Sequence, residues 1–150
     1  MTDLDDLIAP DAVFADVAAA SKKAVLATLG TTSTTLWALD ARMVTDALSR
    51  REKLGSTGFG GGVAIPHARI DGLAGVRVAF VRLARPIDFA AVDDQPVDLI
   101  VLLLSPTDAG ADHLKALARV SRRLREAGLA AKLRGAGSPD ALYALLAGTG

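Results

Sequence analysis

The chain contains two histidines, His67 and His113, and no cysteine. In the stretch GSTGFGGGVAIPHAR at residues 55–69, a glycine-rich segment and a short apolar run lead to Pro66 and then to His67. An imidazole can accept a proton, a metal ion or a phosphoryl group, and a proline directly before it restricts the backbone that aims the ring. We therefore expect this loop to present one oriented histidine to an anion or a phosphoryl group. The alternative is a loop histidine with no special role.

The glycine-rich segment matches neither of the common phosphate-binding spacings. No lysine follows it, as GxxxxGK[ST] requires, and Val63 occupies the last position of a GxGxxG pattern. No helical pattern comes after it, so a nucleotide-binding fold is not expected. Glycines still leave backbone N–H groups open to a small anion, and Ser56, Gly60 and Gly61 are the candidate contacts. A flexible connector is the alternative.

Basic side chains and the second histidine could hold the same anion. Arg50, Arg51 and Lys53 close a predicted helix just before the loop, and an arginine that faces a phosphorylated histidine would make bidentate, charge-assisted contacts. His113 falls in the first turn of another predicted helix, where the partial positive charge favours a neutral ring. The alternatives are basic residues that complement a helix dipole, and a surface histidine.

The familiar motifs for other chemistries are absent from the sequence. There is no Ser-His-Asp order, no paired-carboxylate motif and no HExxH. A metal ion at His67 would find only Asp71 as a nearby acidic ligand, and the lack of cysteine excludes thiolate catalysis and disulfides. We therefore expect no metal site and a set of groups suited to binding or accepting a phosphoryl group.

Composition and charge limit the class of protein. The 150 residues are 51 % hydrophobic and carry 17 basic and 17 acidic side chains, which favours one compact domain with no overall attraction to nucleic acid or membrane. The acidic N-terminus has no basic residue before Lys22, unlike a signal peptide. The longest apolar run, Leu99 to Leu104, is too short to span a bilayer. We expect a cytoplasmic protein without membrane insertion.

Positive charge gathers in one segment. Residues 113–134 contain seven basic side chains and a single acid, Glu126. A solvated helix face explains this pattern, and so does a surface around Arg122 and Arg123 that docks an acidic partner protein. Nucleic-acid binding is not expected, because no aromatic side chains are interleaved with the basic ones.

The elements that position these residues predict an α/β fold, with a mixed β-sheet between helices on both faces and a single domain over residues 1–150. We expect helices first, then strands, then helices again. Turn and helix signals are a short helical turn at Pro10, N-caps at Ser21, Asp40 and Ser138, a helix end near Lys53, a helix after Asp112 through Leu124, and a short helix through Leu129 and Leu133. Strand signals cover Val63–Ile65, Val76–Leu83, Val97–Leu104 and a short extended piece at Pro86–Phe89.

The stretch REKLGSTGFGGGVAIPHARIDGL resembles the characteristic region of the type-2 IIA proteins of the bacterial phosphoenolpyruvate-dependent phosphotransferase system, the fructose/mannitol/nitrogen IIA family. The segments RPIDFAAVDDQPVDLIVLLLSP, ADHLKALARVSRRLR and ALYALLA agree with it, so the resemblance runs from about Pro10 to Ala147. Within the family the chain is most similar to the nitrogen-regulatory IIA proteins. It departs from the family where Gly61 stands for Asn and Ala90 for Asp. The segment TTSTTLWALD is also unlike the more helical connection expected there.

The resemblance implies a phosphocarrier. His67 would be the phosphoacceptor through Nε2, with Nδ1–H oriented by a hydrogen bond to an unidentified partner. His113 matches the second active-site histidine of the family, and Arg51 matches the family arginine. The donor would be the carrier protein NPr or HPr, charged by enzyme I, and no cofactor would stay bound to the domain. The product would regulate partner proteins. The alternatives are a sugar-specific IIA that passes phosphate to a IIB domain, and a binding module that is never phosphorylated.

Overall fold

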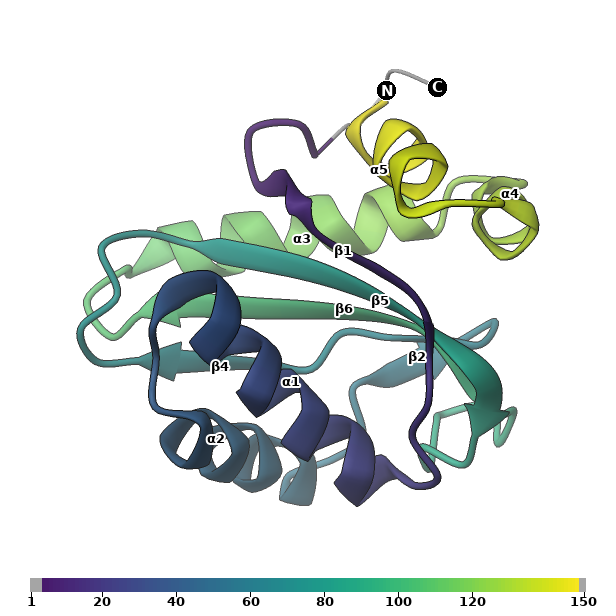
Figure 1. Ribbon diagram of the computed structural model, residues 1–150. Coiled ribbons are helices and arrows are strands. Elements are labelled where there is room, and N and C mark those ends of the chain that lie inside the picture. The colour runs from purple at the N-terminus through teal and green to yellow at the C-terminus, as the bar shows by residue number, and fades with distance from the viewer. Residues whose placement is uncertain (1–3, 149–150) are drawn as a thin grey trace.

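The computed structural model describes residues 4–148 and has a six-stranded mixed sheet between helices, as predicted (Figure 1). The strand order is β1-β5-β6-β3-β2, and β4 also pairs with β6. β6 is therefore the central strand, since it pairs with β3, β4 and β5. The strands are β1 (Ile8–Val17), β2 (Gly58–Gly60), β3 (Val63–Ala64), β4 (His67–Ile70), β5 (Arg77–Ile87) and β6 (Val97–Pro106).

The composition of β6 explains its central place. Its six residues from Leu99 to Leu104 are all aliphatic and at most 1 % exposed, as expected of a strand covered on both faces. It pairs antiparallel with β5 and parallel with β3 and β4. The parallel register sets His67 beside Leu103 and Arg69 beside Ser105. The start of β4 is thus fixed against the most buried strand of the protein.

The helices cover both faces of this sheet. In Figure 1, α1 and α2 lie in front of the strands, and α3 lies behind them. The predicted N-caps are confirmed: Ser21, Asp40 and Ser138 each accept a backbone N–H in the first turn of their helix. The helices are α1 (Lys22–Trp37), α2 (Ala41–Lys53), α3 (Ala111–Leu124), α4 (Leu129–Gly135) and α5 (Pro139–Ala147). None of the helices in residues 4–148 is both long enough and apolar enough to cross a membrane.

The predicted helical turn at Pro10 is wrong, and so is the expected helix-first order. Pro10 lies in β1, which pairs in parallel with β5 at the edge of the sheet. A proline is tolerated there because an edge strand leaves one side unpaired. The pairing joins residues nearly seventy positions apart, such as Ile8 and Val78, and local sequence signals carry no record of it.

The threonine-rich segment is helical, contrary to what its composition suggests. α1 runs through residues 31–35 to Trp37. The hydroxyls of Thr31, Thr32 and Thr35 donate to the carbonyl oxygens four residues earlier, a contact compatible with a helix interior. α3 begins at Ala111, two residues before the predicted start after Asp112, and its N-cap is Gly110.

Candidate functional site

His67 is the first residue of β4 rather than a loop residue, and its ring is half-buried. The strand pairing holds the backbone on both sides of Pro66, because Ile65 N–H donates to Thr57 O and Leu103 N–H donates to Pro66 O. The glycine-rich stretch is partly a strand as well, with β2 and β3 paired antiparallel. The histidine is therefore oriented by the sheet, and more firmly than a flexible loop would allow.

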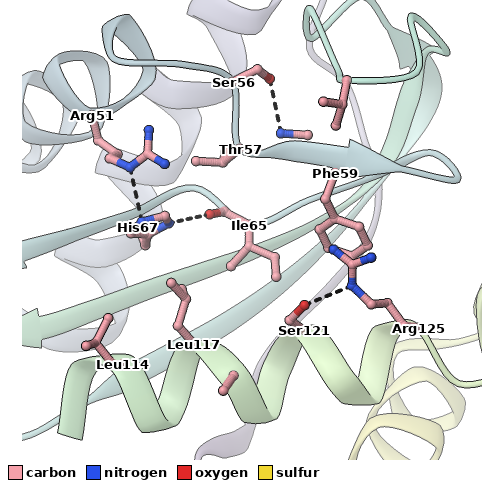
Figure 2. A pocket seen from close by; sticks show the side chains of 13 residues that line it. Arg51, Ser56, Thr57, Phe59, Ile65, His67, Leu114, Leu117, Ser121 and Arg125 are labelled. Atoms are coloured by element: carbon pink, nitrogen blue, oxygen red, sulfur yellow. Dashed lines mark hydrogen bonds between the residues drawn. The ribbon is translucent and has the colours of Figure 1, made fainter. Parts of the chain in front are cut away.

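Two hydrogen bonds define the state of the His67 ring. Nδ1 lies 2.8 Å from the carbonyl oxygen of Ile65, and Arg51 Nε lies 3.2 Å from Nε2 (Figure 2). A carbonyl can only accept and a guanidinium can only donate. Both contacts are satisfied together by one neutral tautomer, with the proton on Nδ1 and the lone pair on Nε2. Nε2 is thus the ring atom that carries the free-base lone pair a nucleophile needs.

The electrostatics of the site favour this neutral ring. Burial lowers the pKa of His67 below its usual 6.5, and the Arg51 charge lowers the pKa further. The Nδ1 hydrogen bond to Ile65 O and the Glu52 carboxylate oppose the shift without reversing it. A lowered pKa leaves the Nε2 lone pair available at neutral pH.

Arg51 is held beside His67 by the end of α2. It lies in the last turn of that helix, where its Nη1 donates to Gly55 O at 2.9 Å. The neighbouring Glu52 is buried and accepts from Thr57 N–H at 3.0 Å and from Lys22 at 2.9 Å, with a second contact from the Thr57 hydroxyl. Glu52 therefore fixes the turn between α2 and β2, which positions the Arg51 guanidinium.

His113 is buried, which excludes the alternative of a surface histidine. It is the third residue of α3, and its ring centroid lies 5.7 Å from that of His67. Burial lowers the pKa of His113, and the charge of Arg69 lowers the pKa further. Its Nδ1 lies 2.7 Å from the hydroxyl of Ser105 on β6. Two histidines nearly fifty residues apart thus share one site.

Two hollows meet at His67. One, of about 390 Å³, is shown in Figure 2 and is mainly apolar, with Phe59 and Ile65 on one side and Leu114 and Leu117 of α3 on the other. The second, of about 500 Å³, is basic and is lined by both histidines together with Arg50, Arg51, Leu54 and Arg69. An apolar partner surface could approach on one side while an anion is held on the other.

The predicted phosphate contacts lie in different places. Ser56 borders the apolar hollow, but its hydroxyl donates to Phe89 O at 2.8 Å and accepts from Gly58 N–H. Gly60 and Gly61 border a separate hollow, and Gly61 N–H donates to the Asp93 carboxylate at 3.0 Å. The structure brings His67, His113 and Arg51 together, and it places Gly60 and Gly61 elsewhere.

The basic segment of residues 113–134 is partly neutralised within the fold. Arg119 pairs with Asp6, Arg123 pairs with Glu126, and Arg134 pairs with Asp98. Arg125 lies over the ring of Phe59, with 4.2 Å between the guanidinium carbon and the ring centroid.

Among the described residues, no group of three or more His, Asp or Glu side chains is placed to hold a metal ion.

Known proteins are similar to this chain in sequence and in structure over nearly its whole length. The family described as "Phosphoenolpyruvate-dependent sugar phosphotransferase system, EIIA 2" matches residues 6–148. A nitrogen regulatory protein of Bradyrhizobium diazoefficiens is 47% identical over 144 residues, which cover 96% of this chain and 94% of the relative. A nitrogen regulatory protein of Pseudomonas aeruginosa is 38% identical, with 97% and 96% covered. The crystal structure of nitrogen regulatory protein IIA-Ntr from Neisseria meningitidis aligns with a TM-score of 0.88 at 33% identity, over 95% of this chain and 98% of that one.

Proposed function

The chain belongs to the EIIA type 2 family of the phosphoenolpyruvate-dependent sugar phosphotransferase system, and we propose that it is a phosphocarrier of the nitrogen-related branch of that system. It accepts a phosphoryl group on His67 and regulates partner proteins according to its phosphorylation state. The observation that carries this proposal is the His67 ring, with Nδ1–H bonded to Ile65 O and the Nε2 lone pair facing the Arg51 guanidinium. We propose that residues 1–150 form one such domain.

The transfer follows from this geometry. The lone pair on His67 Nε2 attacks the phosphorus of a phosphohistidine on the donor protein, and the donor's N–P bond breaks with its electron pair left on the donor imidazole. The His67 ring then carries the phosphoryl group on Nε2 and a proton on Nδ1, and Ile65 O stabilises the positive charge of that ring. Since Arg51 Nε–H occupies the Nε2 lone pair at rest, it must turn to the phosphoryl oxygens during attack.

The donor we propose is NPr or HPr, charged by enzyme I in the cytoplasm. The apolar hollow beside His67 supports a protein donor, because two of its lining residues, Val92 and Leu114, are 78% and 63% exposed. Large exposed apolar side chains next to a reactive group are typical of a docking surface. The positive charge of Arg51 and Arg69 on the other side suits the phosphoryl group itself.

The test is the intact mass of the protein after incubation with phosphoenolpyruvate, enzyme I and NPr, with HPr in a parallel reaction. An acid-labile gain of one phosphoryl group is expected. Passage of that group to a fructose- or mannitol-type IIB domain would reassign the protein to sugar transport. No gain from either carrier, when the carrier itself is phosphorylated, would leave a binding module that is never phosphorylated.

A further inference from the structure

A single hydroxyl lies in the core directly against the second histidine. Ser105 follows the aliphatic run of β6 and is wholly buried. Its Oγ lies 2.7 Å from Nδ1 of His113. Within residues 4–148 this hydroxyl makes no other hydrogen bond that would take its proton. Among the described residues, His113 Nδ1 is therefore the one hydrogen-bond partner of the Ser105 hydroxyl, which is fully buried from solvent.

The direction of this hydrogen bond follows from the requirement that both the Ser105 hydroxyl and His113 Nδ1 have a hydrogen-bond partner. If His113 Nδ1–H donated to Ser105, the hydroxyl proton would be left buried without an acceptor, which is costly. If the hydroxyl donates to the Nδ1 lone pair instead, both groups are satisfied. A neutral imidazole that accepts at Nδ1 carries its proton on Nε2. The burial and the nearby Arg69 charge that lower the pKa of His113 favour the neutral ring.

The remaining polar atom of His113 serves the basic hollow. Both imidazoles line that hollow, and their ring centroids are 5.7 Å apart. Since Nδ1 is held in the core by Ser105, Nε2–H is the one polar group that His113 offers there. A phosphoryl group on His67 Nε2 would occupy the space between the rings, within reach of such a donor.

We propose that Ser105 is a positioning residue for phosphotransfer, because its hydroxyl holds His113 as the Nε2–H tautomer that donates a hydrogen bond to a phosphoryl oxygen on His67. The inference rests on the proposed function for its effect on transfer. No proton leaves His113 in the step: the bond that forms joins His67 Nε2 to phosphorus, the bond that breaks joins phosphorus to the donor histidine, and the electron pair stays on the donor.

The tautomer can be measured without any donor protein. Long-range ¹H–¹⁵N correlation spectra of the full-length protein contain two imidazoles, and a His67→Gln variant identifies the signals of His113. We expect His113 at neutral pH to show a protonated Nε2 and an unprotonated Nδ1. In Ser105→Ala, the Nδ1 signal should shift and the preference for one tautomer should weaken. A wild-type His113 with its proton on Nδ1, or a spectrum that Ser105→Ala leaves unchanged, would overturn the proposal.

The effect on transfer has a matched control in the chain. Ser33 is also wholly buried, and its hydroxyl donates to Gly30 O at 2.7 Å, in α1 rather than at the histidines. We expect Ser105→Ala to slow phosphoryl transfer about tenfold, Ser105→Thr to recover much of the rate, and Ser33→Ala to keep the wild-type rate. Equal rates for Ser105→Ala and wild type would overturn the proposal. If wild type accepts no phosphoryl group, the proposed function fails, whereas the tautomer spectrum still decides the role of Ser105.

Discussion

The two histidines of the site are oriented by hydrogen bonds of opposite direction. His67, on a strand, has its Nδ1 against the backbone carbonyl of Ile65, while His113, on a helix, has its Nδ1 against the side-chain hydroxyl of Ser105. A carbonyl oxygen only accepts, so His67 keeps its proton on Nδ1. A hydroxyl can donate, so it allows His113 to keep its proton on Nε2.

Because of this difference, two side chains of the same type are suited to different roles. His67 presents a lone pair at Nε2, which is what a nucleophile requires. His113 presents an N–H at the same ring position, which is what a phosphoryl oxygen requires. Both rings are kept neutral by lowered pKa values, with burial as the largest cause in each case. In the mechanism we propose, the partner at Nδ1, and not the pKa, makes one histidine a nucleophile and the other a donor.

The largest expected effect comes from removing the nucleophile. His67→Ala should abolish phosphorylation altogether, measured by intact mass after reaction with the donor chain. The half-buried ring loses its hydrogen bonds with Ile65 O and Arg51 Nε, so the free energy of unfolding should fall by only about 1–2 kcal/mol, measured by urea denaturation. Stable phosphorylation of the variant would contradict the assignment of His67, since another residue would then be the acceptor.

The second-largest effect is expected from Arg51, the cation that hydrogen-bonds to His67. Changing Arg51 leaves the contact between Ser105 and His113 in place. Arg51→Ala should slow transfer about 10²-fold, because a charged donor to the phosphoryl oxygens is lost. Arg51→Lys should recover part of the rate, since lysine keeps the charge and loses the planar donor. The control is Arg42→Ala, an exposed arginine in the first turn of the same helix. Equal rates for Arg51→Ala and Arg42→Ala would remove Arg51 from the mechanism.

A smaller effect separates docking from chemistry. Leu114 is 63% exposed, is adjacent to His113 in sequence and lines the apolar hollow beside His67. Leu114→Glu should raise KM for the phosphorylated donor about tenfold and leave kcat nearly unchanged, because a charge in an apolar contact opposes association. Met43→Glu on α2, 37% exposed and outside that hollow, is the control. A fall in kcat at constant KM would contradict a docking role for Leu114.

The smallest effect concerns stability against pH. Both histidines have folded-state pKa values below 6.5, so the unfolded chain binds protons first as pH falls. The free energy of unfolding should therefore decrease from pH 6.5 down to the folded-state pKa values and level off below them. Asp6 and Asp93 also have lowered pKa values, but their contribution is lost only below about pH 4.

Urea denaturation of wild type and of a His67→Gln, His113→Gln double variant at pH 7.5 and pH 5.5 checks this linkage. The double variant should lose the difference between the two pH values that the wild type shows. A stability of wild type that rises toward pH 5.5 would mean that the folded protein favours charged histidines, and the neutral tautomers would have to be abandoned.

Local signals in the sequence predict those elements whose causes are local. Ser21, Asp40 and Ser138 start helices because a side-chain oxygen caps the first turn, and the aliphatic run of β6 predicts a buried strand. β1 was missed because parallel pairing with β5 is long-range and overrides the local turn preference of Pro10. The same pairing logic makes His67 a strand residue, since β4 exists only through its contact with β6.

The residues of the site also differ in whether local sequence or long-range packing determines them. Chemistry alone suggests both histidines and a basic cluster that includes Arg51, and the resemblance selects Arg51 from that cluster. Their approach in space depends on α2, β4 and α3 packing around β6. Ile65 O could not be identified from residue types, because a backbone carbonyl leaves no trace in the sequence. Ser105 did leave a signal, a hydroxyl directly after six buried aliphatic residues, and such a polar group needs a partner. Gly60 and Gly61 were predicted because glycine leaves the backbone N–H group open to an anion, and residue type does not say where that N–H group points.

The proposed division of roles between the two histidines depends on one atom, Nε2 of His67. The most direct measurement is the ¹⁵N and ³¹P spectrum of the protein labelled with ¹⁵N-histidine and phosphorylated by its donor chain. We predict one phosphorus coupled to Nε2 of His67, with Nδ1 of the same ring still protonated. A phosphorus coupled to Nδ1 of His67, or to either nitrogen of His113, would contradict the division of roles between the two histidines.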